Sequence, residues 1–413
     1  MRTTRRTLTA AAGLLLLFAA TVPASAQPPE RGVYEISAGA QERVARAGVD
    51  VLGVRDGTLT VVASPAEVAS LRAEGLDLRP VGDVDRVLAE RNPDRRAAPG
   101  DFPAGDEGYH TYAEVTAELR QAAQDHGDVT ALSSVGESFE GRALHLVKIS
   151  DHVERDEAEP EVLFTCNQHA REHLTTEMCL HIVQRFTDSY GHDPVVTQFV
   201  DSREIYVIPT VNPDGAEYDI AGGRYQGWRK NRQGEGTDLN RNWGHRWGCC
   251  GGSSGHEGSE TYRGTAAFSA PETKAVADFV DSRVVGGTQQ ITGHIDFHSY
   301  SELVLWPYGH TTDDVGEGMT PDQAQRLRSV GEEMAAANGY TPQQSSDLYV
   351  TDGDINDWMW GRHRILSFTF EMYPADGPGL DGFYPPDEQI RPQTERNDAA
   401  VDILLREAGA DRA

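Results

Sequence analysis

Three short apolar segments of this sequence each run directly into a polar side chain. EVLFTCNQ ends just before His169, IDF ends just before His298, and SFTF ends just before Glu371. Such short, apolar, β-rich runs are typical of strands buried in a sheet. Ligands of open α/β sheets collect at the carboxyl ends of the strands. We therefore expect these three side chains, although distant in the sequence, to converge on one site.

Helices separate the strands from Tyr112 onward. ALHLVKIS and REIYVIPTVNP are further strand-like segments, whereas APETKAVADFVDSRVV and PDQAQRLRSVGEEMAAANG have helical character. TTEMCLHIVQRFTDSY is a predicted helix with Thr175 or Thr176 near its N-terminal cap. This alternation predicts an α/β domain with a mixed β-sheet flanked by helices.

Residues 27 to about 98 form a separate unit in the sequence. DVLGVRDGTLTVVA predicts two strands around an Asp-Gly turn, and SPAEVASLRAEG predicts a helix capped by Ser64 with Pro65 at its first position. The polar stretch ERNPDRRAAPGDFPAGDEG follows and is expected to be a flexible loop, in which Arg95-Arg96 offers a site for an activating protease. We predict a small α+β propeptide domain with its cleavable linker over 27–98 and the main domain over 99–413. An accessory domain that stays attached is the alternative.

Residues 1–26 have the features of a secretory signal peptide. A basic start precedes an apolar run from Leu14 to Phe18, and an A-S-A sequence ends at Ala26. The run is too short to span a bilayer, and no later run approaches the ~20 residues that a spanning helix needs. The chain is therefore expected to be secreted, with no membrane association. The Arg5-Arg6 pair leaves the twin-arginine route open beside general export.

The formal net charge of -28 restricts the partners of the chain. Nucleic acid and anionic lipid both require a basic surface, so we expect neither as a partner. An acidic surface is compatible with calcium binding, although no EF-hand-like loop indicates a calcium site. We expect a monomer with a strongly solvated surface.

The stretch FTCNQHAREHLTTE contains two overlapping metal-binding patterns. H-x-x-E-H would make His169 and His173 the ligands and Glu172 the base, and it requires a continuous helix. H-x-x-E makes His169 and Glu172 the ligands and requires a third ligand and a base elsewhere. The strand-like EVLFT contradicts the helix, and His298 and Glu371 supply the missing groups. We therefore predict one zinc ion held by His169, Glu172 and His298, a His₂Glu set that leaves a position for water, with Glu371 as the base.

The four cysteines of an exported chain are expected to be oxidised. A bridge between Cys166 and Cys179 would hold the strand before His169 against the following helix. Cys249 and Cys250 are adjacent, so they either form a vicinal bridge or pair differently. Three connectivities are available, and the spacing does not choose between them.

Eight blocks in collinear order carry a family resemblance from about Tyr109 to the C-terminus. They are NQHAREH, PTVNPDG, WRKNR, DLNRNWG, SETYRG, IDFHSY, LYVTDGDINDW and FTFEMY. In this order they resemble the zinc carboxypeptidase family, which includes pancreatic carboxypeptidases A and B and secreted bacterial carboxypeptidases T. The resemblance implies a zinc-dependent exopeptidase that acts on the C-termini of peptides and proteins. It also implies that His169, Glu172 and His298 bind zinc and that Glu371 activates the attacking water.

The same resemblance implies roles for residues that bind the substrate. Arg229, in WRKNR, matches the arginine that polarises the scissile carbonyl, although Arg232 lies one turn away and could replace it. Asn240 and Arg241 match the pair that grips the terminal carboxylate, a task that suits the planar fork of a guanidinium. Tyr349 matches the mobile tyrosine that closes over bound substrate.

Four further residues are candidate contacts for substrate. Arg171 and Tyr300 match residues of the subsites just upstream of the cleaved bond, and Asn356 is at the specificity position of the pocket. Asp354, two residues earlier, could place a carboxylate in or beside the pocket. We therefore expect mixed specificity for apolar or aromatic and for basic C-terminal residues. Alternatively, Asp354 caps a turn after Gly353 and never meets substrate.

A different hydrolase on the same scaffold is the alternative function. A zinc amidase or deacylase acting on cell-wall peptides would keep the zinc set but is expected to lack the complete Asn-Arg pair and the closing tyrosine. Both features are present here, as Asn240-Arg241 and Tyr349. The sequence therefore favours the exopeptidase.

Overall fold

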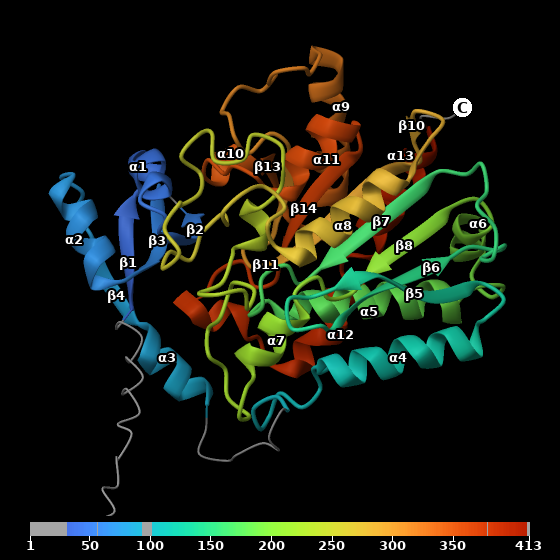
Figure 1. The fold of residues 1–413 in the computed structure, drawn as a ribbon, viewed down its shortest axis with the longest axis horizontal. Coiled ribbons are helices and arrows are strands. Elements are labelled where there is room, and N and C mark those ends of the chain that lie inside the picture. The colour runs from blue at the N-terminus through green and yellow to red at the C-terminus, as the bar shows by residue number, and fades with distance from the viewer. Residues whose placement is uncertain (1–30, 56, 93–100, 378, 411–413) are drawn as a thin grey trace, which may run out of the picture.

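The computed structural model describes residues 31–55, 57–92, 101–377 and 379–410. The predicted signal peptide, Asp56 of the Asp-Gly turn and the Arg95-Arg96 site lie outside these residues. The described chain forms a small N-terminal unit, blue in Figure 1, and a larger domain built around one long sheet. In the described ranges, no helix has both the length and the apolar character needed to cross a membrane.

The larger domain is built on an eight-stranded mixed sheet with the strand order β13-β12-β14-β11-β7-β8-β6-β5. Neighbours β14, β11, β7 and β8 are parallel, whereas β12 is antiparallel to β14, and β6 is antiparallel to both β8 and β5. The mixed sheet predicted from the sequence is therefore confirmed. The strands are β5 Thr130–Glu137, β6 Ala143–Ile149, β7 Glu161–Cys166, β8 Glu204–Ile208, β11 Ile291–Ser299, β12 Leu303–Trp306, β13 Thr341–Gln344 and β14 Leu366–Met372.

Helices cover both faces of this sheet. Apolar residues of α4, α5, α9 and α13 join one hydrophobic cluster with the sheet, and those of α8 and most of α11 join a second. The helices are α4 Tyr112–Asp125, α5 His173–Asp188, α6 Pro194–Val200, α7 Pro213–Asp219, α8 Pro271–Ser282, α9 Pro321–Asn338, α10 Ser345–Leu348, α11 Ile355–His363, α12 Ile390–Glu395 and α13 Asp398–Ala410. Shorter elements are the 3₁₀ turns η2 Leu239–Arg241, η3 Gly379–Phe383 and η4 Asp387–Gln389 and the small hairpin of β9 Val284–Val285 and β10 Thr288–Gln289.

Alternation along the strands separates core residues from site residues. Phe297 on β11 and Phe370 on β14 belong to the larger hydrophobic cluster. Because side chains alternate along a strand, the next residues, His298 and Glu371, point to the opposite face. The two are direct partners in the parallel register of β11 and β14. The sheet thus places a histidine and a carboxyl group side by side at its carboxyl edge.

The N-terminal unit is a four-stranded antiparallel sheet accompanied by helices. Its strand order is β2-β3-β1-β4, with β1 Gly32–Ser37, β2 Asp50–Arg55, β3 Thr58–Ala63 and β4 Arg79–Asp83. The remaining elements are η1 Ala38–Ala40, α1 Gln41–Arg46, α2 Pro65–Ala73 and α3 Val84–Arg91. Ser64 caps α2 in a reciprocal box with Glu67, and Pro65 is its first residue, as predicted. The unit has its own core, which includes Val44, Leu59 and Leu71.

The structure contains one of the three disulfide connectivities that the sequence left open. Cys166 at the end of β7 is bonded to Cys179 on α5, with Cα atoms 6.3 Å apart, and Cys249 is bonded to Cys250. This connectivity is the one of the three in which each cysteine pairs with the nearest other. Helix α5 begins at His173, two to three residues before the cap expected at Thr175 or Thr176.

Candidate active site

His298 is far from His169 and Glu172 in the sequence, but the neighbouring strands β7 and β11 bring the polar atoms of all three together. His169 follows β7, Glu172 is the residue just before α5, and His298 is on β11. Glu172 Oε1 lies 2.8 Å from His169 Nδ1, Glu172 Oε2 lies 2.9 Å from His298 Nδ1, and the two Nδ1 atoms are 3.1 Å apart. All three groups are buried, and their ligand atoms lie within 4.8 Å of one another. Two imidazoles and one carboxylate form a donor set that fits a catalytic zinc ion.

The other ring nitrogen of each histidine contacts a second buried carboxylate. His169 Nε2 lies 3.0 Å from Asp238 Oδ1, and His298 Nε2 lies 2.5 Å from Asp296 Oδ2. Both carboxylates are fully buried. Such outer contacts fix the tautomer and ring orientation of a metal-binding histidine. The two imidazoles therefore present Nδ1, and not Nε2, to the shared position.

Hydrogen-bond donors hold Asp296 in place. Thr165 Oγ1 donates to Asp296 Oδ1 over 2.6 Å, and Gln168 Nε2 donates to Asp296 Oδ2 over 2.6 Å. Burial alone would raise the pKa of this carboxyl, but His298, together with His294 and the Thr165 hydroxyl, outweighs burial and lowers the pKa. Asp296 is therefore ionised and can accept a hydrogen bond from the imidazole.

Glu172 is ionised for a similar reason. Burial opposes its charge, yet the two adjacent histidines more than compensate and lower the pKa of Glu172 below its ordinary value. A negative ligand beside two imidazoles suits a divalent cation, because ligands must be deprotonated to bind.

Glu371 is beside this group on the wall of the cavity. Loss of hydration there raises the pKa of Glu371 to about 8, and the negative charge of Glu172 adds to the effect, whereas His298 opposes it. A carboxyl group whose pKa lies near the working pH can both accept and return a proton. Its position and proton affinity therefore fit a general base.

Arg229, and not Arg232, points into the cavity. The Arg229 guanidinium donates to Asp238 Oδ2 from Nε over 3.2 Å and from Nη2 over 3.0 Å, and its side chain is buried. Asp238 therefore binds both His169 and Arg229 and fixes their relative position. Arg232 instead lies over the rings of Tyr218 and Trp228.

Asn240 and Arg241 are carried by the short turn η2. Arg241 is held by three contacts: Nε donates to Gly252 O over 3.0 Å, Nη1 to Asn240 O over 2.6 Å and Nη2 to the Tyr349 hydroxyl over 3.2 Å. Asn240 Oδ1 accepts the backbone N–H of Ile355, and its Nδ2 lies 3.3 Å from His298 Nε2. The guanidinium is thus oriented before any ligand arrives.

These groups border one cavity with a volume of about 670 Å³, including its open mouth. Eleven of the residues singled out from the sequence line it, together with side chains from both units. The lining comprises Val51, Leu52, His169, Glu172, Arg229, Asn240, Arg241, His298, Ser299, Tyr300, Leu305, Ser345, Leu348, Tyr349, Thr351, Asp354, Asn356, Thr369, Glu371 and Phe383.

Asp354 both caps a helix and borders the cavity. Its side chain accepts the backbone N–H of Asp357 at the start of α11 and the hydroxyl of Thr351 over 2.6 Å. Burial, followed by repulsion from Asp357, raises the pKa of Asp354 to about 7. Capping and pocket lining, which the sequence presented as alternatives, therefore coexist.

The Asn356 side chain is fixed by hydrogen bonds to strand β14. Its Nδ2 donates to Thr369 Oγ1 over 2.8 Å, and its Oδ1 accepts the Ser367 hydroxyl over 2.6 Å. Both partners are on β14, on the same face as Glu371, so the bottom of the cavity is polar.

Tyr300 lines the cavity, but Arg171 does not. The Tyr300 hydroxyl donates to Gly379 O over 2.8 Å, and its ring packs edge-on against Phe383. The Arg171 guanidinium lies over the Phe383 ring, 4.1 Å from the ring centroid, and its Nη2 donates to Asp50 Oδ2 over 2.7 Å. The predicted contact residue Arg171 therefore meets the N-terminal unit in this structure.

Asp50 of the N-terminal unit lies between two arginines of the larger domain. It pairs with Arg171, and Asp50 Oδ1 lies 3.9 Å from Arg229 Nη1. Burial would raise the pKa of Asp50, but Arg171 and Arg229 outweigh it and lower the pKa. Val51 and Leu52, the next residues, line the cavity. The unit thus contacts the site directly.

Within the described part of the chain, two further groups of metal-ligating side chains come together outside the cavity. Asp156, Glu161 and Glu204 form one of them, but Arg283 pairs with Asp156 and Glu161, and Lys148 pairs with Glu204. The other, Asp151 with His152 and Glu157, is on the surface. Cations of the protein already pair with all three carboxylates of the first group, so it is an ion-pair network.

Comparison with known proteins identifies the family. The family described as zinc carboxypeptidase matches residues 115–400. The chain belongs to the zinc carboxypeptidases. A zinc carboxypeptidase of Saccharothrix mutabilis subsp. capreolus is 51% identical over 394 residues, which cover 93% of this chain and 90% of the relative. Carboxypeptidase B of Bos taurus is 32% identical over 308 residues, 71% of this chain and 69% of that protein.

A solved structure agrees on the fold. The carboxypeptidase A of Helicoverpa armigera superimposes with a TM-score of 0.73 at 24% identity and covers 93% of this chain and 98% of its own. This zinc carboxypeptidase is thus a metallocarboxypeptidase with the expected α/β fold, and its family implies zinc as the metal.

Three residues of this zinc carboxypeptidase were missed in the sequence. Asp238 is two residues before Asn240 in DLNRNWG, and Asp296 is two residues before His298 in IDFHSY. The period of two along a strand could have pointed to Asp296, because it shares a face with His298. No local pattern marks Asp50, which becomes notable only through the docking of the two units.

Proposed function

We propose that this chain is a secreted metallocarboxypeptidase, made as a proenzyme, that removes single residues from the C-termini of peptides and proteins. The fixed guanidinium of Arg241 in the same cavity as the His₂Glu group carries the proposal. The planar guanidinium of Arg241 in this cavity selects a terminal carboxylate, which an internal peptide bond lacks. Secretion is proposed on residues 1–26 alone.

His169, Glu172 and His298 hold the zinc ion in this proposal. When bound there, zinc supplies Lewis-acid polarisation of the scissile carbonyl and lowers the pKa of water. Glu371 accepts the proton of the attacking water and passes it to the leaving amine. Arg229, fixed by Asp238, faces the oxygen on which negative charge develops, where a fixed donor contributes about 3–4 kcal/mol.

The remaining candidates bind the substrate. Arg241 and Asn240 receive the terminal carboxylate, and Tyr349, whose hydroxyl contacts Arg241, closes the cavity behind it. The last side chain enters the pocket between Asp354 and Asn356. Tyr300 contacts the substrate residues upstream of the cleaved bond. Arg171 becomes available to contact the same residues after the N-terminal unit, with Asp50, has been released.

Mixed specificity follows from the polar end of this pocket. Apolar side chains fit above the neutral amide of Asn356, which is already paired with Thr369 and Ser367. Basic side chains pair with Asp354 in its ionised form. The position of Asp354 on the cavity wall supports this second class of substrate.

The N-terminal unit, residues 27–98 with the linker, acts as an inhibitory propeptide. Asp50 engages Arg171 and Arg229, and Val51 with Leu52 borders the cavity. Gln41 Nε2 also donates to Leu348 O over 3.2 Å, next to Tyr349. An activating protease that cuts at Arg95-Arg96 would release these contacts.

A peptide assay tests the proposed function. Secreted protein is treated briefly with trypsin and assayed, with and without a zinc chelator, on N-blocked peptides that end in Phe, Leu, Lys, Arg or Glu and on a matched Phe amide. We expect chelator-sensitive release from the Phe and Arg acids and none from the amide. Cleavage of the amide at a similar rate would reject the carboxylate clamp and favour the amidase.

A further inference from the structure

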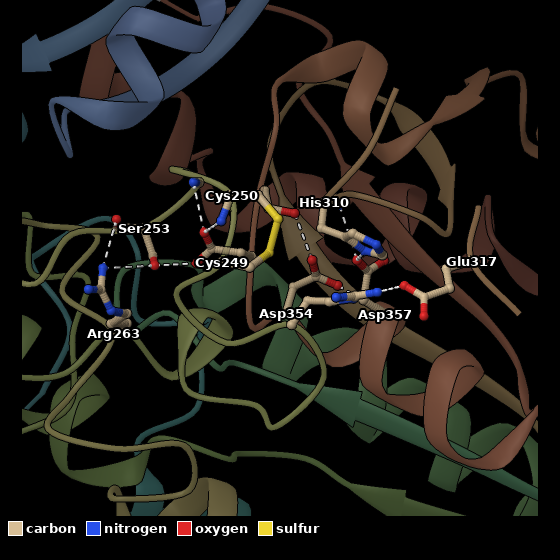
Figure 2. Close-up of a disulfide and its surroundings, with 12 residues drawn as sticks. Cys249, Cys250, Ser253, Arg263, His310, Glu317, Asp354 and Asp357 are labelled. Carbon is tan, nitrogen blue, oxygen red and sulfur yellow. Dashed lines mark hydrogen bonds and ion pairs between the residues drawn. A yellow bond between two sulfur atoms is a disulfide. The ribbon is translucent and has the colours of Figure 1, made fainter. Parts of the chain in front are cut away.

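A loop that carries the Cys249–Cys250 disulfide contacts Arg241 from outside the cavity. Figure 2 shows this disulfide with Ser253 on the same loop. Both cysteines are exposed, whereas Gly252 and Ser253 are buried. Gly252 O accepts the hydrogen bond from Arg241 Nε over 3.0 Å. The loop therefore supplies one of the acceptors that orient the guanidinium.

Asp352 also binds this loop, by accepting hydrogen bonds from three of its residues. Its Oδ2 accepts the backbone N–H of Cys250 over 3.1 Å and that of Gly252 over 2.9 Å, and its Oδ1 accepts the Ser253 hydroxyl. Asp352 is fully buried. Removal of the carboxylate would leave buried donors without an acceptor, which costs about 1–3 kcal/mol for each group. The loop is therefore bound in one position.

These contacts close into a ring. Gly252 is held through its N–H by Asp352 and through its C=O by Arg241. Asp352 is three residues after Tyr349, whose hydroxyl accepts from Arg241 Nη2 over 3.2 Å. A Cβ on Gly252 would lie 2.3 Å from the Thr351 carbonyl carbon, so only glycine allows the two segments to approach this closely.

We propose that Asp352 is a positioning residue for recognition of the substrate carboxylate. Asp352 binds the N–H of Gly252, and the C=O of Gly252 accepts from Arg241, so Asp352 fixes the position of the guanidinium. The same contact holds the segment from Tyr349 to Asp352 against the loop, and the Cys249–Cys250 disulfide restricts the conformations of that loop. The inference rests on the role of Arg241 in the proposed function. Because Asp352 contacts neither the zinc position nor Glu371, its loss weakens binding and leaves the chemical step in place.

Asp352→Asn tests this inference, because its amide keeps only one acceptor oxygen and cannot accept all three donated hydrogen bonds. Trypsin-treated protein is assayed on the Phe-ending peptide acid, and product inhibition by free phenylalanine is measured in parallel. We expect KM and the inhibition constant of phenylalanine to rise about tenfold together, equivalent to one charged hydrogen bond. The kcat should stay within about threefold of wild type, and the zinc content should not change.

Asp214→Asn is the matched control. Asp214 is also buried and accepts from the Ser138 hydroxyl, the Glu140 N–H and Arg142, but it lies on α7 outside the cavity lining. It should lower Tm and leave KM unchanged. If Asp352→Asn is not secreted, the double variant Cys249→Ser/Cys250→Ser is judged by the same constants.

Values of KM and the phenylalanine constant within twofold of wild type, in the variant that folds, would overturn the inference. A wild-type enzyme that does not prefer the acid to the amide would instead overturn the proposed function. That second failure is visible before any variant is assayed.

Discussion

Asp238 and Asp296 each contact the nitrogen of a histidine that faces away from the shared Nδ1 position. Imidazole offers either nitrogen to a metal, and the hydrogen bond at one decides which is presented. Here a buried carboxylate makes that choice for both histidines. The two differ in their other partners, since Asp238 also binds Arg229 whereas Asp296 binds only neutral donors of Thr165 and Gln168.

Asp296→Asn should weaken zinc binding. The amide is a poorer acceptor for the imidazole N–H and no longer supports the ligand with a negative charge, so we expect zinc affinity to fall about 10–100-fold. Competition with a chromogenic chelator measures the dissociation constant directly. The same constant in Asp214→Asn should match wild type, and an unchanged constant in Asp296→Asn would remove Asp296 from the support of His298.

Substrate preference should depend on pH through Asp354. Its raised pKa of about 7 leaves the carboxyl neutral at pH 6 and negative at pH 8. The ratio of kcat/KM for Arg-ending to Phe-ending peptides should therefore rise with pH, by up to about tenfold across this range. Asp354→Asn should flatten the ratio. A ratio independent of pH in the wild type would show that Asp354 does not meet the basic side chain.

Single residues were predictable where a motif fixed both type and spacing. Arg229 was uncertain in the sequence because Arg232 has the same charge one turn away, and only the contact with Asp238 distinguishes them. Asp354 was uncertain because capping and pocket lining look alike in sequence. Both questions depend on the direction of a side chain, which spacing alone does not specify.

At the scale of elements, the site depends on β7, β11 and β14. These strands are neighbours in the sheet, and their side chains alternate between its two faces. Their parallel register brings the ends of three distant segments to one edge of the sheet. Apolar runs followed by polar residues made this convergence predictable. The order of the outer strands was not predictable, because no sequence pattern indicates which of these strands pair with one another.

The Cys166–Cys179 disulfide couples two of these elements, β7 and α5. A bridge with a sequence separation of 13 restricts the unfolded chain, and its loss should lower the free energy of unfolding by about 3 kcal/mol. We expect a Cys166→Ala/Cys179→Ala variant to unfold at lower denaturant concentration. An unchanged midpoint would mean that packing of α5 alone holds the two elements together.

At the scale of the whole molecule, the N-terminal unit lies against one side of the larger domain (Figure 1), and its Val51 and Leu52 line the cavity. The existence of this unit and its α+β character were predictable from composition and turn residues. Its docking was not, because contacts such as Asp50 with Arg171 and Gly48 O with the Ser259 hydroxyl join surfaces far apart in sequence.

Asp50→Asn should weaken this docking in the full chain. It leaves the buried Arg171 without its negative partner, a loss that costs about 3–5 kcal/mol in comparable buried pairs. Activity before trypsin treatment should rise at least about tenfold, while activity after treatment stays unchanged. Glu35→Gln, which removes an exposed pairing with Arg79 in the same unit, serves as the control. Equal activity of Asp50→Asn and wild type before treatment would remove Asp50 from the inhibition.

The most direct test of the account follows a peptide with a free C-terminus by mass spectrometry during digestion by the trypsin-treated enzyme. We expect a ladder of products, each shorter by one C-terminal residue, that stops on chelation and resumes when zinc is restored. Zinc-loaded Glu371→Gln should give no ladder. Internal fragments, a ladder that survives chelation, or a ladder from Glu371→Gln would contradict the account.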